Sequence, residues 1–109
     1  MPNVSRAYAA MPADVQEAYE IVRSPIRVHI ARHLAANPQS QISELVAAIG
    51  GQRATMYEHL VQMERLGVVE LSHDTGQRSR RWVTYSLNVE RWNQLVLRLT
   101  VTPEAPKQQ

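Results

Sequence analysis

The sequence has 109 residues, of which 44% are apolar, so it predicts one small folded domain rather than a disordered chain. It contains no Cys, which excludes disulfides and thiolate sites, and its apolar runs are too short to cross a bilayer, so we expect a cytoplasmic protein with no membrane partner. The net charge of +2 is weak support for a nucleic-acid partner, but all the basic residues except Lys107 are Arg, which suits bidentate contacts to phosphate and guanine.

The first third of the chain predicts two helices after a flexible start. Residues 1–11 have no apolar period and are expected to be a flexible N-terminus, whereas residues 12–23 have apolar side chains at helical spacing. Ser24 is suited to cap a second helix and Pro25 to open it, and Asn37-Pro38 should end that helix. Its expected core side chains are Val28, Ile30, Ala31 and Leu34.

The middle of the chain predicts two more helices joined by a tight turn. Residues 43–49 are expected to form a short helix capped by Ser43 and ended by Gly50-Gly51. Residues 53–66 should form a longer helix, which Gly67 ends. The expected inward side chains of the two helices are Leu45, Val46, Ile49, Met56, Leu60 and Met63.

The apolar period then changes from helical to alternating, which is typical of strands. Residues 68–73 and 81–87 are predicted to form two strands joined by a turn at 74–77. One face of the second strand should carry Val83, Tyr85 and Leu87.

The end of the chain predicts a last helix and a tail. Asn88 should cap a helix over residues 89–100. Residues 102–109 contain two Pro and no large apolar side chain, so they are expected to form a disordered tail. The folded domain should therefore span residues 12–101.

This order predicts a fold that is mainly α with a small β-hairpin, in the α+β class. Two short helices joined by a Gly-containing turn and followed by a hairpin are typical of a winged helix-turn-helix, here with five helices and a two-to-three-stranded wing at 73–82. In such a fold the second helix of the pair, at 53–66, enters the major groove of DNA. Its polar residues opposite the apolar stripe are Arg53, Thr55, Tyr57, Glu58, His59 and Gln62.

A series of short segments in this order is similar to the ArsR-type winged-helix regulators. The segments are Ser24-Pro25-Ile26-Arg27, Ile42-Ser43-Glu44-Leu45, Thr55-Met56-Tyr57-Glu58-His59-Leu60, Gly67-Val68-Val69-Glu70 and Trp82-Val83-Thr84-Tyr85-Ser86-Leu87. The resemblance covers about residues 24–88. It implies a transcriptional regulator, expected to be a repressor, that binds double-stranded DNA as a homodimer. The first and last helices of each subunit are then expected to form the dimer interface. Gly51 and Glu58 depart from the family pattern, which usually has Leu and a basic residue there.

The residues expected to contact DNA lie in two groups. Arg53 suits either a phosphate or a guanine, Thr55 and Tyr57 suit phosphate or a thymine methyl, and Glu58 suits a cytosine amine. The wing arginines suit phosphates or the minor groove. The full set is Gln52, Arg53, Ala54, Thr55, Tyr57, Glu58, His59, Gln62, Arg78, Ser79, Arg80 and Arg81.

The apolar stripes of the first and last helices predict a dimer interface. A domain of this size has difficulty burying both stripes within one chain, so a second copy is the expected cover. The predicted interface residues are Val15, Tyr19, Val22, Trp92, Leu95, Val96 and Leu99.

Other chemistry has less support in the sequence. His29 and His33 have the spacing of two metal ligands on one helix face, but zinc needs a third, so we expect no metal or cofactor. Gly50-Gly51 is not followed by the Lys-Ser/Thr of a phosphate loop, so we expect no enzyme. Two alternatives stay open: a winged-helix protein-interaction module that does not bind DNA, which Glu58 permits, and an accessory DNA-binding factor of a phage or mobile element.

Overall fold

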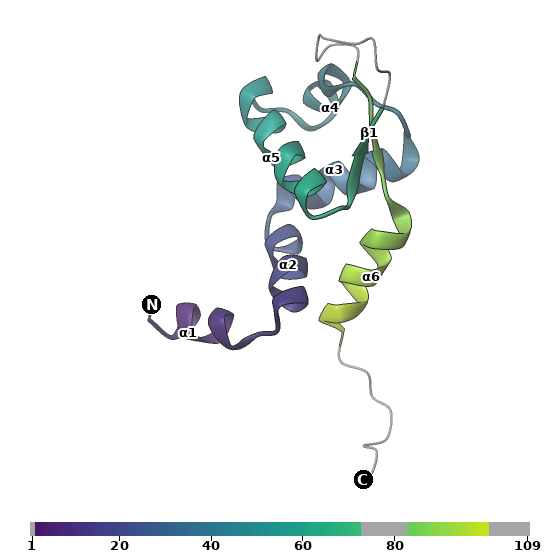
Figure 1. The fold of residues 1–109 in the computed structure, drawn as a ribbon. Helices are drawn as coiled ribbons and strands as arrows, with labels where there is room; N and C mark the ends of the chain where they lie inside the picture. The colour runs from purple at the N-terminus through teal and green to yellow at the C-terminus, as the bar shows by residue number, and fades with distance from the viewer. Residues whose placement is uncertain (1, 73–82, 101–109) are drawn as a thin grey trace.

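The computed structural model describes residues 2–72 and 83–100 of the chain. These residues form six helices and a two-stranded antiparallel sheet, so the mainly helical α+β class is confirmed (Figure 1). The elements are α1 (Pro2–Ala10), α2 (Ala13–Val22), α3 (Pro25–Ala36), α4 (Ile42–Ile49), α5 (Arg53–Arg65), β1 (Val69–Leu71), β2 (Tyr85–Leu87) and α6 (Val89–Leu99). None of the helices in these two ranges combines the length and the apolar character that a membrane span requires.

The segment before α2 was expected to be a flexible N-terminus, but residues 2–10 form the helix α1. The side-chain amide of Gln16 donates to the backbone oxygens of Tyr8 at 2.9 Å and of Met11 at 3.0 Å. The rings of Tyr8 and Tyr19 lie 5.9 Å apart. Contacts from α2 therefore hold the end of a helix that has no apolar period of its own, and α1 extends away from the rest of the molecule (Figure 1).

Side-chain caps set the starts of three helices. Ser24 Oγ accepts from the Arg27 N–H at 3.3 Å and Asn88 Oδ1 accepts from the Arg91 N–H at 3.0 Å, which confirms both predicted caps. The predicted cap of α4 was wrong, because α4 begins at Ile42 and Gln41 is its N-cap. The Glu44 carboxylate accepts from the Gln41 N–H at 2.7 Å, as in a capping box.

The core is almost wholly aliphatic and lies where α3, α4 and α5 meet the sheet. All three predicted inward residues of α5 are buried, and so is the predicted stripe of α3 except Val28, which is half-buried. Ile21 of α2 was not predicted to be inward and is buried as well. The largest buried side chains are Ile21, Ile30, Leu34, Leu45, Met56, Leu60, Met63, Tyr85 and Leu95.

The strands form a hairpin whose described part pairs Val69 with Leu87 and Leu71 with Tyr85. The tip predicted at 73–82 lies outside the described residues. Ser40 also pairs with Tyr85: each backbone N–H donates to the other residue's carbonyl, at 3.0 and 2.8 Å. This bridge supplies the single-residue equivalent of a third strand and fixes the segment that leads into α4 against the hairpin.

Candidate nucleic-acid interface

A two-residue glycine turn joins α4 to α5. Gly50 and Gly51 have φ values of 99° and 89°, a backbone conformation that residues with a Cβ atom adopt only with strain. Only three residues, 50–52, separate the end of α4 from the start of α5, and the two helices pack against each other. The predicted pair of helices with a tight turn is therefore present, and the β1–β2 hairpin follows it directly.

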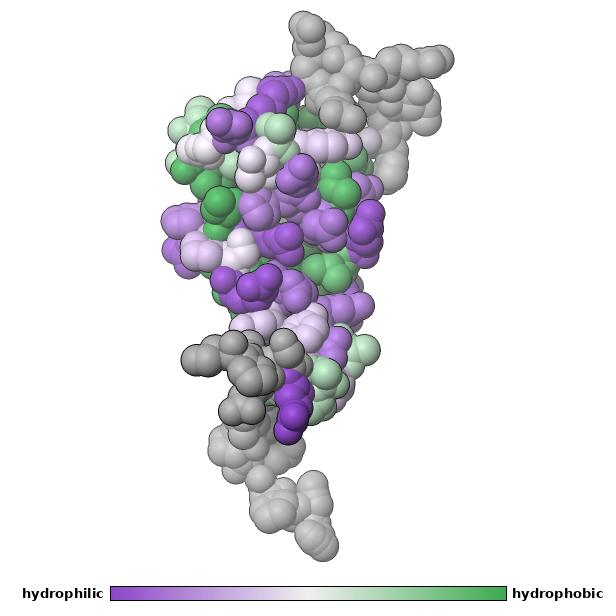
Figure 2. Space-filling model, turned by 90° about the vertical axis from the view of Figure 1, so that its left-hand side faces the viewer, coloured by the Kyte–Doolittle hydropathy of each residue, from purple (hydrophilic) through white to green (hydrophobic). Residues whose placement is uncertain are grey.

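Helix α5 has one buried face and one exposed end. Met56, Leu60 and Met63 recur at helical spacing and are at most 2% exposed. Five of the predicted DNA-contacting residues are exposed at its N-terminal end, and these are Gln52, Arg53, Ala54, Thr55 and Glu58. The side of the molecule that carries α5 is mainly hydrophilic, with apolar side chains in small separate patches (Figure 2).

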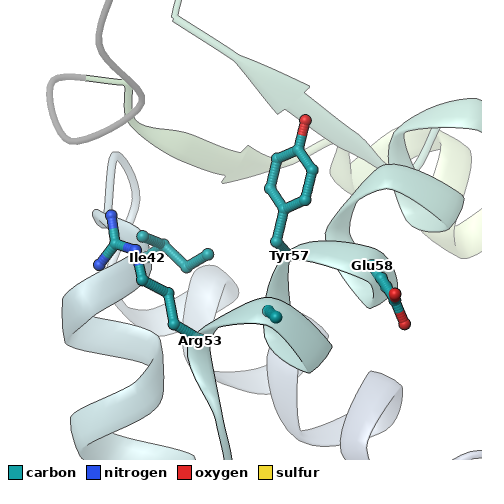
Figure 3. A pocket seen from close by; sticks show the side chains of 5 residues that line it. Ile42, Arg53, Tyr57 and Glu58 are labelled. Carbon is teal, nitrogen blue, oxygen red and sulfur yellow. The ribbon is translucent and has the colours of Figure 1, made fainter.

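An open pocket of about 550 Å³ lies at this exposed end of α5. It is lined by Ile42 of α4 and by Arg53, Ala54, Tyr57 and Glu58 of α5 (Figure 3). Tyr57, which was predicted to contact phosphate or a thymine methyl, is half-buried and packs against the core. The tyrosine ring therefore serves as a wall of this pocket.

His59 and Gln62 lie apart from this exposed end and face the chain's own helices. His59 Nδ1 accepts a hydrogen bond from Arg27 Nε at 3.1 Å. Gln62 lines a second pocket with residues of α1 and α2, among them Tyr8 and Glu17. Direct DNA contact at these two positions stays a prediction, and within the chain His59 also contacts Arg27.

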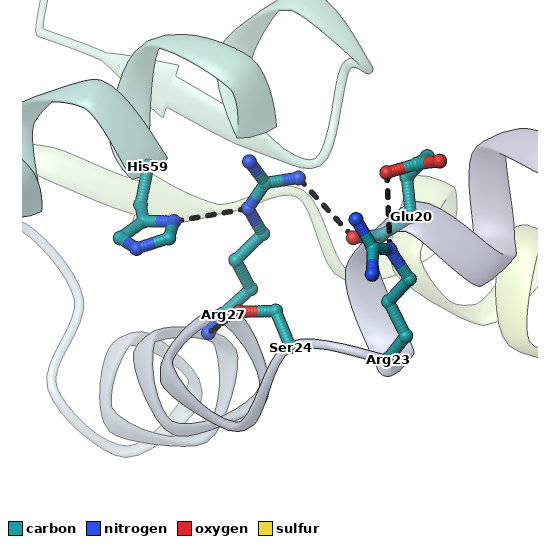
Figure 4. A network of polar contacts seen from close by, with 5 residues as sticks. All are labelled: Glu20, Arg23, Ser24, Arg27 and His59. Atoms are coloured by element: carbon teal, nitrogen blue, oxygen red, sulfur yellow. Dashed lines mark hydrogen bonds and ion pairs between the residues drawn. The ribbon is translucent and has the colours of Figure 1, made fainter.

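Arg27 links three helices, and the sequence analysis did not identify it as a functional residue. Its guanidinium reaches His59 of α5 and also donates through Nη1 to the Glu20 backbone oxygen of α2 at 3.2 Å (Figure 4). The Glu20 carboxylate in turn pairs with Arg23 Nε at 3.4 Å. These contacts join the end of α2 to the middle of α5 through α3.

The same contacts shift the pKa of His59. Burial and then the nearby Arg27 guanidinium lower this pKa below its ordinary value, and the opposing effect of Glu58 is smaller. The neutral form is needed because Nδ1 must accept the Arg27 hydrogen bond. Protonation would replace that bond with two adjacent positive charges.

We therefore expect the free energy of unfolding to fall as the pH decreases below about 6.5, because the unfolded chain then takes up a proton at His59 before the folded chain does. Above that pH the neutral His59 contributes its full stabilisation of the folded chain. Urea denaturation between pH 7.5 and pH 5 measures it, and His59→Gln should flatten the profile, because a glutamine oxygen still accepts from Arg27 without titrating. His29→Gln is the matched control, since His29 is exposed. Parallel profiles for wild type and His59→Gln would contradict the expectation.

The predicted wing contacts lie outside the described residues. Arg78, Ser79, Arg80 and Arg81 belong to residues 73–82, so their role stays a prediction. Of the two described strands of the hairpin, β1 packs against α5 and β2 pairs with β1 (Figure 1).

The predicted dimer interface divides into a buried part and an exposed part. Leu95 is 2% exposed in the single chain and belongs to its own core, so its assignment to an interface was wrong. Trp92 and Leu99 also pack against that core, and Val15 and Val96 are half-buried. The exposed members are Tyr19 and Val22 of α2, and the exposed Leu97 of α6 was not predicted.

The physical reason is that α2 and α6 pack against each other within one chain. Arg91 Nη2 pairs with Glu17 at 2.9 Å, and Arg98 Nε pairs with Asp14 at 2.6 Å. Arg91 Nε also donates to the Leu66 carbonyl at 3.0 Å, which ties α6 to the end of α5. Helices α2 and α6 are thus fixed to α5 as well as to each other.

The chemistry of the exposed α5 end is that of a hydrogen-bonding surface. It presents a guanidinium, an amide, a hydroxyl and a carboxylate from a helix that is anchored by its opposite face. Among residues 2–72 and 83–100, no three His, Asp or Glu side chains gather as metal ligands would.

No family model matches this chain, and no curated protein is significantly similar to it.

Proposed function

We propose that the chain is a regulator of transcription, a repressor, that binds specific sequences of double-stranded DNA as a homodimer and has no catalytic role. In this proposal the fold is a winged helix-turn-helix of the ArsR type. Helix α5 enters the major groove, and residues 73–82 form the wing on the backbone or in the minor groove.

The observation that carries the proposal is the exposed N-terminal end of α5. Residues 52–55 and Glu58 are exposed there, although the same helix buries Met56, Leu60 and Met63. A helix that recognises DNA bases needs both an exposed polar end and a buried face. The polar side chains form hydrogen bonds with the base edges, and the buried face holds the helix backbone in place. The glycine turn and the hairpin on either side are the neighbours that such a helix has in winged proteins.

A homodimer is proposed because apolar side chains remain exposed on the end helices. The exposed large apolar residues of these two helices, α2 and α6, are Tyr19, Val22 and Leu97, apart from Val89 at the start of α6. Burial against the same helices of a second copy would cover them. The two α5 helices would then face successive major grooves about 34 Å apart, which predicts an operator with imperfect two-fold symmetry.

A protein-interaction module is the second candidate, and Glu58 favours it. Its carboxylate is exposed on the face that would meet the DNA, where it repels phosphates. A carboxylate on that face also reads cytosine by accepting from its amino group, which is the role we propose.

We expect Arg53→Ala to lower the affinity for the selected operator by about 5- to 150-fold per half-site and to relax the preference at one base pair of each half-site, because a bidentate guanine contact is worth about 1–3 kcal/mol. The measurement is selection of binding sites from random duplexes, followed by titration of the enriched sequence. Arg65→Ala is the matched control. Arg65 is exposed on the same helix but lies about 18 Å further along its axis.

Three results would contradict the proposal. The first is that wild type enriches no sequence from the random duplexes. The second is that binding disappears for every duplex between about 50 and 200 mM salt, as for purely non-specific contacts. The third is that Arg65→Ala changes base preference as much as Arg53→Ala does.

A further inference from the structure

The pocket at the exposed end of α5 has an apolar floor and a cationic edge. Ile42 is buried beneath it, Ala54 leaves its Cβ as the only side-chain atom at the surface, and the half-buried Tyr57 supplies a ring. In Figure 3, Ile42 lies between the side chains of Arg53 and Tyr57, whereas Glu58 points away from them. The apolar part of the pocket is thus edged by the Arg53 guanidinium and not by the carboxylate.

The apolar lining of this pocket is not needed on a helix surface that only forms hydrogen bonds. Residues 53, 54, 57 and 58 lie on one side of the helix, since they are separated by one turn. A larger side chain at position 54 would occupy part of the pocket that Ala54 lines. The small residue therefore leaves space for an apolar group that arrives from outside, at the end of α5 that is proposed to meet DNA.

We propose that this pocket receives the C5-methyl group of a thymine in the major groove, with Arg53 contacting a neighbouring guanine. The inference rests on the proposed function and deepens it by naming what the pocket reads. Thymine is the base whose major-groove edge carries an apolar group, and a guanidinium beside the methyl suits the charge of the surrounding DNA. The pocket of about 550 Å³ accepts the edge of a base, not the methyl alone.

The selected operator, prepared with thymine or with uracil in its place, tests the proposal on the wild-type protein. Uracil pairs as thymine does and lacks only the methyl. We expect uracil at the read position to weaken binding about fourfold per half-site, and about 15-fold when both half-sites carry it, from the usual gain per buried methyl-sized group. When cytosine is placed at the read position, addition of a 5-methyl group to it should raise the affinity about fourfold.

Ala54→Met places a flexible apolar side chain, which a helix tolerates well, in part of the pocket that Ala54 lines. It should bring the thymine-to-uracil ratio of affinities close to one. Ala35→Met is the matched control, since Ala35 is also an exposed alanine in a helix, α3, but does not line the pocket. The control should keep the wild-type ratio.

Equal affinity of wild type for the thymine and uracil operators overturns this inference and leaves the pocket to another occupant, such as a small apolar molecule. That result leaves the proposed function intact, because a selected operator still exists. Failure to select any operator overturns the proposed function itself. A wild-type ratio that persists in Ala54→Met would place the methyl contact elsewhere on the protein and also overturn the inference.

Discussion

Replacement of Leu60 by Ala is expected to lower the free energy of unfolding by about 2–5 kcal/mol. Leu60 is 0% exposed and lies in α5 between Met56 and Met63, on the face that anchors the helix to the core. The change removes buried apolar surface and leaves a cavity that close-packed neighbours fill only in part. A domain of this size is typically stable by about 5–15 kcal/mol, so a large part of its stability depends on this side chain. Urea denaturation followed by circular dichroism measures the loss.

Leu97→Ala is the matched control for this experiment. It makes the same chemical change in another helix, α6, at a side chain that is 69% exposed in the single chain. At a protein concentration low enough to keep the chain monomeric, the control should alter stability by no more than about 0.5 kcal/mol. If Leu60→Ala costs no more than Leu97→Ala does, α5 is not anchored as the structure describes.

Helix α5 could be predicted from the sequence because its determinants are local. Met56, Leu60 and Met63 recur at the helical period, and glycines stand at both ends of the segment. The caps Ser24 and Asn88 are local for the same reason, since the cap side chain and the N–H that it accepts from lie three residues apart. Periodicity therefore located most of the helices and the core side of α5.

Contacts between distant residues could not be predicted in this way. Arg27 and His59 are 32 positions apart, and no spacing rule connects them. Helix α1 depends on the contacts that Gln16 and Tyr19 make with its last residues, and Leu95 is drawn inward because α6 packs against α2. The apolar stripes were located correctly, but what covers each of them is a property of the folded chain.

Charge placed on the exposed part of the α2 stripe should separate the proposed dimer. Val22 is 37% exposed in the last turn of α2, so Val22→Asp should leave the monomer folded, with an unchanged circular dichroism spectrum. If a second copy covers Val22, the new carboxylate is buried without a partner, which strongly disfavours association. Loss of the tethered second half-site should then weaken binding to a two-fold symmetric operator by about 100- to 10,000-fold. Sedimentation at micromolar concentration and titration of the operator measure the two effects.

Val89→Asp gives the comparison that separates a lost interface from a general effect of added charge. Val89 is 54% exposed at the first position of α6, where the helix dipole favours an acidic residue, and it lies outside the predicted interface. This variant should remain a dimer with nearly wild-type affinity. For Val22→Asp, affinity for a single half-site should equal that of wild type, because α5 and its exposed end are untouched. A wild-type chain that is monomeric at micromolar concentration, or a Val22→Asp chain that stays dimeric with full affinity, would show that the apolar residues of α2 serve another purpose.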